Sequence, residues 1–369
     1  MHQTFYGPQG PVEPLTIAIQ PDDHYRGQEA GSFSDRWIQR APSAGVDVRV
    51  VDVWSPDIVD QIRGAQGFMW RYMNRVRERR LGKMLCPAVE LGLGIPTYPS
   101  WKTGRYYEDK LAQKYALEAA GIPIPPTWVF YDDETALSFS RVATYPLVMK
   151  LATGVMSMSV VLIESRAEAE YWIREMFGPG TATLDRPATP AADRWRRIKE
   201  GSRLARGKVS HRRVAWAGLQ HGYILFQEFL PGNEFDTRVT VVGNRAWGFR
   251  RFNRPGDFRS SGSGLIDYDP SGIDEAVVRL GFTVARQLGT QSLTVDGLVR
   301  GSEPVLGEIS YSYQSHAVSQ CPGHWVLEGP PKDGRLRWVR GPSFSEDAIF
   351  DDFVSLARSQ AQPSPIQLG

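Results

Sequence analysis

The feature that most constrains the fold is a regular alternation of short apolar runs and amphipathic stretches over the first hundred residues. Apolar runs at 15–20, 46–53 and 67–73 are separated by amphipathic stretches at 33–44 and 56–64. Runs of this length predict buried strands, and the amphipathic stretches predict helices. Because parallel strands must be joined by crossover connections, this order predicts a parallel βαβ sheet.

After this lobe the pattern changes to strands joined by short turns. A basic helix is predicted at 74–93, and the prolines that follow it place the end of the first lobe near Arg105. The turn Val242-Gly243-Asn244-Arg245 has the chemistry of a hairpin. The other predicted elements are helices at 106–121 and 272–288, a helix that begins at Asp132 or Asp133, and strands at 127–131, 147–151, 159–164, 223–230, 236–242, 246–253, 292–299 and 304–311. The fold class is therefore α/β (α+β).

The sequence divides into parts of different character. They are an N-terminal α/β lobe at 1–105, a central lobe at 106–225, a C-terminal lobe at 226–330 and a polar tail at 331–369. The central lobe contains a segment at 178–222 that we interpret as an insertion, because it carries nine Lys or Arg against two acids between Asp193 and Arg213. A charge run of this kind is usually a solvated face, and the alternative is a site for an anionic acceptor.

Composition excludes several classes of protein. The 43 Lys and Arg against 41 Asp and Glu give a formal charge of +2, so no field of the whole molecule favours nucleic acid. Cys86 and Cys321 are too few for a disulfide framework and lack the spacing of a zinc site. There is no run of 18 apolar residues and no positively charged leader, so we expect no membrane span, no signal peptide and a cytoplasmic location.

Lysine is the rare cation of this chain, with eight Lys beside 35 Arg. Lys110 opens the helix at 106–121, and Lys150 ends a strand just before a loop of small residues. Two lysines that converge on one ligand supply point charges for phosphate oxygens. The alternative is that both are solvated surface lysines, as most lysines are.

Two carboxylates fall on the paired strands of the last hairpin. Asp296 and Glu308 are twelve residues apart around a short turn, so both can face the same side of the sheet. Hard carboxylate oxygens in this arrangement suit magnesium that bridges nucleotide phosphates. The alternative is a pair of carboxylates that face water.

The order and spacing of several short motifs resemble the ATP-grasp superfamily of ATP-dependent carboxylate ligases over residues 15–325. The motifs, in chain order, are Asp109-Lys110, Pro146-Leu147-Val148-Met149-Lys150, Phe226-Gln227-Glu228-Phe229-Leu230-Pro231-Gly232-Asn233-Glu234, Asp236-Thr237-Arg238-Val239, Asp296 and Gly307-Glu308-Ile309-Ser310. The resemblance implies an ATP-grasp fold: an N-terminal βαβ lobe followed by two small-sheet lobes that clasp a nucleotide. Within the superfamily, the amino-acid sequence is similar to that of bacterial proteins of surface-polysaccharide or metabolite gene clusters.

The resemblance also implies roles for individual residues. ATP would be bound by Lys110 and Lys150 at the phosphates, by Gly154 and Ser157 in the covering loop, by Gln227, Glu228, Phe229 and Leu230 along the base, and by Glu234 at the ribose. Mg²⁺ would be held by Asp296, Glu308 and Ser310, and the acyl-phosphate site would be lined by Arg238, Arg251 and Arg259. Because a strand alternates its faces, Arg250 and Arg251 are not expected to point inward together.

The implied activity is a Mg-ATP-dependent ligase that works through an acyl phosphate and releases ADP and phosphate. Its partners would be a small-molecule carboxylate and an amine or hydroxyl acceptor. The resemblance is also compatible with a homodimer. Two departures from the family pattern leave alternatives: the covering loop has a single glycine, Gly154, and Ser310 stands where an asparagine is usual. The alternatives are a phosphotransferase on the same scaffold and a degenerate nucleotide-binding or adaptor protein.

Overall fold

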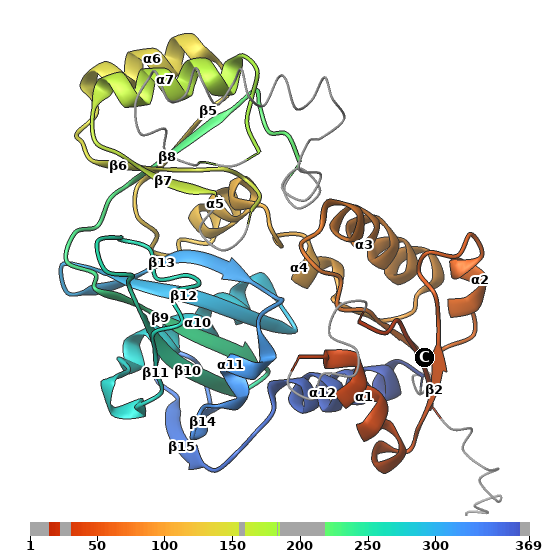
Figure 1. The fold of residues 1–369 in the computed structure, drawn as a ribbon. Coiled ribbons are helices and arrows are strands. Elements are labelled where there is room, and N and C mark those ends of the chain that lie inside the picture. The colour runs from red at the N-terminus through yellow and green to blue at the C-terminus, as the bar shows by residue number, and fades with distance from the viewer. Residues whose placement is uncertain (1–14, 23–30, 155–158, 183, 185–217, 362–369) are drawn as a thin grey trace, which may run out of the picture.

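The computed structural model describes residues 15–22, 31–154, 159–182, 184 and 218–361 of the chain. Three sheets organise these residues (Figure 1). In that view the central sheet lies above the large C-terminal sheet, and the N-terminal lobe lies to one side of both. The mixture of a parallel sheet with two antiparallel sheets confirms the predicted fold class.

The N-terminal sheet has four parallel strands in the order β2-β1-β3-β4. Its elements are β1 (Leu15–Ile19), α1 (Phe33–Arg40), β2 (Val46–Val50), α2 (Ile58–Ile62), β3 (Gly67–Met69), α3 (Val76–Ala88) and β4 (Thr97–Tyr98). A short 3₁₀ turn, Ala41–Ala44, extends α1, and a π turn, Val89–Leu93, extends α3. Each strand is reached through a helix, as the alternation of the sequence predicts.

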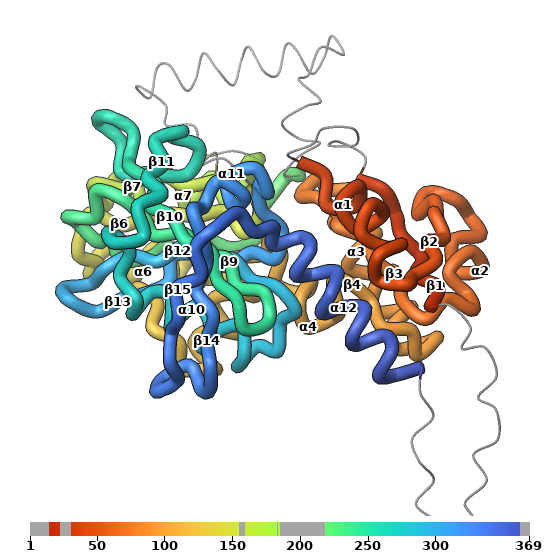
Figure 2. Tube along the Cα trace, turned by 90° about the horizontal axis from the view of Figure 1, so that it is seen from below, coloured from red at the N-terminus to blue at the C-terminus, as the bar shows by residue number. Residues whose placement is uncertain are grey.

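The described part of the segment 331–369 is not the polar tail that its composition suggests. Residues Arg335–Arg340 form strand β15, and Ser345–Ala361 form a helix of 17 residues, α12. This helix returns to the N-terminal lobe and lies beside α1 (Figures 1 and 2). Bidentate Arg–Asp pairs, Arg36–Asp347 and Arg40–Asp351, join the two helices along their polar sides.

We expect α12 to be essential for the stability of the N-terminal lobe. Phe353 is buried, and its ring lies so close to strand β3 that a side chain at Gly67 would clash with it. Replacing Phe353 by alanine should lower the free energy of unfolding by about 3–5 kcal/mol, because the lost ring leaves a cavity. Urea unfolding measures this, with the exposed Ser355→Ala on the same helix as the control. A change below about 1 kcal/mol for Phe353→Ala would show that the helix contributes little to the stability of the lobe.

The central sheet has four strands in the order β5-β8-β6-β7, all antiparallel. Helix α4 (Trp101–Gly104), which contacts α3, precedes the central lobe. The elements of the lobe are α5 (Lys110–Ala119), β5 (Thr127–Phe130), α6 (Asp133–Val142), β6 (Leu147–Lys150), β7 (Val160–Ile163), α7 (Arg166–Phe177) and β8 (Ile224–Glu228). Helices α6 and α7 lie side by side over one face of this sheet (Figure 1). The sequence analysis did not predict α7, which begins after its N-cap Ser165. Most of the basic segment falls outside the described residues.

The C-terminal sheet follows the path β13-β12-β9-β10-β14-β15, and β11 pairs with β10. Its elements are β9 (Phe235–Val242), β10 (Arg245–Phe252), β11 (Ile266–Asp267), a 3₁₀ turn (Pro270–Gly272), α10 (Glu275–Leu288), β12 (Ser292–Arg300), β13 (Glu303–Ser310), α11 (Ser315–Ser319) and β14 (Gly323–Glu328). Helix α10 packs on the sheet through Gly281, whose missing side chain leaves room for Val239, Val241 and Val295. Among the described residues, no helix is long and apolar enough to cross a membrane.

Candidate functional site

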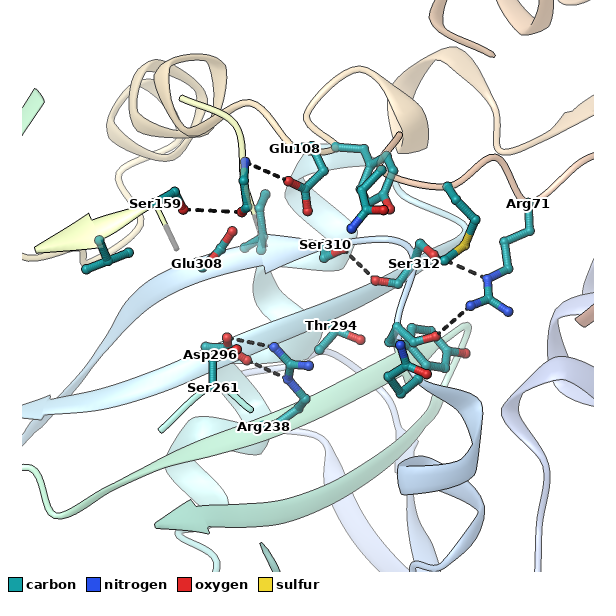
Figure 3. A pocket seen from close by; sticks show the side chains of 18 residues that line it. Arg71, Glu108, Ser159, Arg238, Ser261, Thr294, Asp296, Glu308, Ser310 and Ser312 are labelled. Atoms are coloured by element: carbon teal, nitrogen blue, oxygen red, sulfur yellow. Dashed lines mark hydrogen bonds and ion pairs between the residues drawn. The ribbon is translucent and has the colours of Figure 1, made fainter. Parts of the chain in front are cut away.

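Two adjoining hollows lie where the three lobes meet. The larger, about 400 Å³, is lined by residues of all three lobes, including Arg71, Glu108 and Arg238. The smaller, about 170 Å³, lies between the central and C-terminal sheets. Both hollows are lined by Asp296 and Glu308, so one pair of carboxylates stands at the junction of the two spaces. Figure 3 shows the larger one, which we call the lobe-junction cavity.

The two carboxylates are set opposite each other by the hairpin of β12 and β13. Asp296 and Glu308 are direct partners in the register of this strand pair, next to an irregularity after Asp296. Side chains of directly opposed residues leave the same face of a sheet. The spacing of the sequence therefore gave the correct pairing, and both groups face the central lobe.

Asp296 is the hub of a cluster of ions. Arg238 donates to both of its oxygens, with distances of 2.7 and 2.8 Å (Figure 3). Nη2 of Arg251 lies 2.8 Å from Oδ2. Burial disfavours the charged carboxylate, but the two guanidinium groups outweigh it and lower the pKa of Asp296 well below its usual value. Asp296 therefore remains ionised at every physiological pH.

Arg251 is buried and binds a second carboxylate on the neighbouring strand. Its Nε and Nη2 donate to Asp236 at 2.7 and 2.6 Å. The adjacent Arg250 points the other way and pairs with Asp267. The alternation expected for these two arginines is therefore seen, and Arg251 is the one that faces the site.

Lys110 opens α5, where the side chain of its N-cap Asp109 accepts a hydrogen bond from the backbone of Ala112. The Nζ atom of Lys110 lies 3.0 Å from Oε1 of Glu308. Burial opposes the charge of this lysine, but Glu308 and Glu108 together raise the pKa of Lys110 above its usual value. Lys110 is thus a fixed positive charge in contact with Glu308.

Lys150 ends strand β6, and its side chain reaches the hairpin of β12 and β13. Its Nζ donates to the carbonyl oxygen of Gly307 at 3.1 Å, next to Glu308. Burial lowers the pKa of Lys150 to about 8, although Glu308 acts in the opposite direction. Two lysines on different elements of the central lobe, α5 and β6, therefore converge on one hairpin of the C-terminal lobe.

The smaller hollow is lined by both charged and apolar side chains. Charged groups such as Lys150 and Asp296 line it together with the apolar side chains of Val148, Phe229 and Leu298. The ring of Phe229 meets Phe258 edge to face, with centroids 5.7 Å apart. All of Gln227, Glu228, Phe229 and Leu230 line this hollow. The side chain of Gln227 is held by Thr127, and Glu228 forms an ion pair with Arg300. A slot between strands with these walls suits a flat aromatic ring.

The remaining predicted residues are spread around the rim. Glu234 is exposed and lines a neighbouring pocket rather than the hollow between the sheets. Arg259 donates two hydrogen bonds to the carboxylate of Asp257 and one to the carbonyl oxygen of Val160 on β7. It therefore joins the C-terminal lobe to the central sheet. Ser310 lines the lobe-junction cavity and donates to the carbonyl oxygen of Ser312 at 2.6 Å.

The covering loop is described only in part. Gly154 has a φ of 137°, which a side chain would strain, and its N–H donates to Glu108 at 3.2 Å. Ser157 lies outside the described residues. The role of this loop in binding a ligand stays a prediction.

Sequence reasoning missed two residues of the lobe-junction cavity. Arg71 is fully buried, pairs with Asp22 at 3.3 Å and donates to the carbonyl oxygen of Tyr313, which ties the N-terminal lobe to the loop after β13. Glu108 is a buried carboxylate just before Asp109-Lys110. Its position two residues before Lys110 was the only sequence signal that could have pointed to it.

The oxygen donors here are too few to hold Mg²⁺ by themselves, but they fit Mg²⁺ that is also bound by a phosphate ligand. No group of three or more His, Cys, Asp or Glu able to hold a metal occurs among the described residues. The site instead offers two carboxylates and the hydroxyl of Ser310 along one hairpin. Mg²⁺ commonly binds in this way, through one or two carboxylates completed by phosphates and water. The donor set therefore fits Mg²⁺ together with a nucleotide.

Comparison with solved structures identifies the fold. A RimK domain ATP-grasp protein from Sphaerobacter thermophilus has a TM-score of 0.50 at 16% identity, covering 92% of this chain and 99% of that one. A D-alanine–D-alanine ligase from Bacillus anthracis has a TM-score of 0.55 at 12% identity, covering 94% and 100%. Biotin carboxylase from Campylobacter jejuni has a TM-score of 0.54 at 14% identity, covering 95% and 72%. The chain has the ATP-grasp fold, as the motif series implied.

Sequence comparison gives a partial match to a curated protein. A probable alpha-L-glutamate ligase from Enterobacter sp. (strain 638) is 27% identical over 222 residues, which are 58% of this chain and 59% of that protein. The chain thus spans less than two thirds of the length of this curated relative. No protein-family model matches the sequence.

Proposed function

We propose that this protein is a Mg-ATP-dependent ligase that joins a small carboxylic acid to an amine through an acyl phosphate. One observation carries the proposal: Lys110 and Lys150 from the central lobe converge on the opposed carboxylates Asp296 and Glu308, beside an apolar slot between two sheets. The fold and the probable ligase relative support it.

In the proposed reaction the smaller hollow holds the nucleotide. Adenine would lie against Phe229 and Leu298, and the phosphates would run toward Lys150 and Asp296. Magnesium bound with the nucleotide would supply charge neutralisation of the transferred phosphoryl group. The two lysines add fixed positive charge from the protein, and such preorganised charge stabilises the transition state without reorganisation.

The lobe-junction cavity would hold the acid and its acceptor. It opens at the carboxylate pair, so an acid bound there lies next to the terminal phosphate of the nucleotide. The acid oxygen takes the phosphoryl group, and the amine then attacks the acyl carbon and displaces phosphate. Arg238 lines this cavity and would steady the negatively charged intermediate, because its planar donors suit phosphate and carboxylate oxygens.

A screen of acids against amines, followed by ADP and phosphate release, tests the proposal. L-glutamate belongs in the first pool, as acid and as amine, because the probable relative is named for it. A ligase should release ADP and phosphate in equal amounts, and only when both an acid and an amine are present. ADP without free phosphate would indicate a phosphotransferase, and nucleotide binding without turnover of any pair would contradict the proposed activity.

Nucleotide binding should be accompanied by proton uptake at Lys150. In the free protein burial lowers the pKa of this lysine to about 8, so near pH 8 about half of the molecules hold it neutral. Phosphates favour the charged form and raise this pKa, so ATP binding takes up about half a proton near pH 8 and very little at pH 6.5. Calorimetry in buffers of different ionisation enthalpy measures the uptake. Lys150→Arg should abolish it, since arginine is charged throughout, and uptake that persists in this variant would assign the proton to another group.

A further inference from the structure

Glu108 has a backbone conformation that only a strong local constraint maintains. Its φ is 49°, and it is the one non-glycine residue with a positive φ in the described part of the chain. For a side chain such as glutamate this region costs of the order of 1–3 kcal/mol and persists only where the surroundings impose it. Neighbouring Tyr107 is buried in an aromatic cluster, its ring centroid 4.7 Å from that of Tyr311, which fixes the backbone on one side.

This conformation places a buried carboxylate at the edge of the lobe-junction cavity. Glu108 is 9% exposed and lines the cavity from the side opposite strand β13 (Figure 3). Its Oε2 accepts the backbone N–H of Gly154 in the covering loop at 3.2 Å. Oε2 holds this hydrogen bond, so among the described residues Oε1 is the oxygen left for a molecule in the cavity.

The other charges of the cavity are already neutralised within the protein. Arg71 is paired with Asp22, Arg238 with Asp296, and Glu308 with Lys110. Glu108, in contrast, forms no direct ion pair with a Lys, Arg or His of the described residues, and Lys110, which acts on it at longer range, is bound to Glu308. The cavity therefore has one carboxylate without a direct cationic partner, and a cationic ligand group would supply one.

We propose that Glu108 binds the ammonium group of the amine acceptor and removes its proton before the acceptor attacks the acyl phosphate. The acceptor is thus a primary amine that enters as its cation, and this inference rests on the proposed ligase function. One proton passes from the ammonium nitrogen to the carboxylate of Glu108, and the free lone pair attacks the acyl carbon. The C–N bond forms, the bond from carbon to the phosphate oxygen breaks, and phosphate leaves with that electron pair. The second amine proton leaves to solvent.

The surroundings of Glu108 suit a base. Burial raises the pKa of its carboxyl, and the charge of Glu308 acts in the same direction, whereas Lys110 and Arg79 oppose them. A carboxylate with a raised pKa is a better proton acceptor near neutral pH than an exposed one. The hydrogen bond from the Gly154 N–H holds one oxygen of this carboxylate in position.

The test separates an amine that must lose a proton from one that is already neutral. Glu108→Gln is assayed with an alkyl or amino-acid amine and, separately, with hydroxylamine, which is largely unprotonated at neutral pH. With the protonated amine, kcat/KM should fall by about 10²-fold or more, the usual contribution of a general base. With hydroxylamine the loss should be at least tenfold smaller. The control is Glu118→Gln, which removes the exposed partner of Lys114 on the same helix and should alter neither rate.

The outcomes distinguish this inference from the proposed function. If the wild type forms no hydroxamate from any acid and ATP, the ligase proposal fails. If the wild type forms hydroxamate, and Glu108→Gln lowers kcat/KM equally with both amines or with neither, the ligase function stands and the role of Glu108 is refuted. Should Glu108→Gln fold poorly, Glu108→Asn replaces it, because asparagine tolerates a positive φ and also lacks the charge. The same difference between the two amines is expected of it.

Discussion

Replacement of Lys150 by methionine is expected to lower ATP-dependent turnover about 10²–10³-fold, the usual effect of removing one preorganised donor from a charged transition state. Lys150 ends strand β6 and lies over the hairpin that carries Glu308. Methionine keeps the length and the apolar stem but removes the charge. The rate of ADP release at saturating acid and amine measures the effect.

The same variant should be at least as stable as the wild type. Burial lowers the pKa of Lys150, which means that the folded protein disfavours its charge near neutral pH. Removing that charge therefore removes a cost of folding. Lys332→Met, at an exposed site, is the matched control and should change neither rate nor stability. A Lys150→Met protein with wild-type turnover would exclude this lysine from the phosphate site.

Replacement of Arg251 by methionine should lower the free energy of unfolding by about 3–5 kcal/mol, the typical cost of leaving buried charges without their partner. Arg251 is buried between Asp236 and Asp296, and its loss would leave two carboxylates close together with Arg238 as the remaining cation. Urea unfolding at pH 7 measures the loss.

The loss should become smaller as the pH falls. Burial and Asp296 already raise the pKa of Asp236 in the intact protein, and without Arg251 that pKa rises further, so acid neutralises the unpaired charge. The matched control is the neighbouring Arg250→Met, whose partner Asp267 is more exposed and whose loss should cost about 1 kcal/mol or less. Equal losses for the two variants would show that Arg251 does not hold the cluster together.

Local periodicity predicted those parts of the site that belong to single strands and turns. The pairing of Asp296 with Glu308 follows from the turn between them, and the opposite directions of Arg250 and Arg251 follow from the two-residue repeat of a strand. The meeting of Lys110 and Lys150 at one hairpin needed the family pattern as well, because the two lie on different elements forty residues apart in the sequence.

Features that depend on distant packing could not be predicted in this way. Helix α12 lies in a segment of polar composition, and its buried residues Phe350 and Phe353 have partners some 300 residues earlier in the chain. The left-handed backbone of Glu108 is imposed by neighbours such as the Tyr107–Tyr311 contact, and glutamate has no preference for it. Whether Glu234 contacts a ribose stays a prediction, since it lies outside the hollow between the sheets.

The central claim is that the hollow between the central and C-terminal sheets binds ATP together with Mg²⁺, and calorimetric titration of ATP with and without Mg²⁺ tests it most directly. We expect the wild type to bind ATP much more tightly with Mg²⁺. Glu308→Gln, checked for folding by its melting temperature, should lose most of that metal-dependent gain, because one of the two opposed carboxylates is gone. ATP binding that is absent from the wild type, or that Mg²⁺ and Glu308→Gln leave unchanged, would contradict the account.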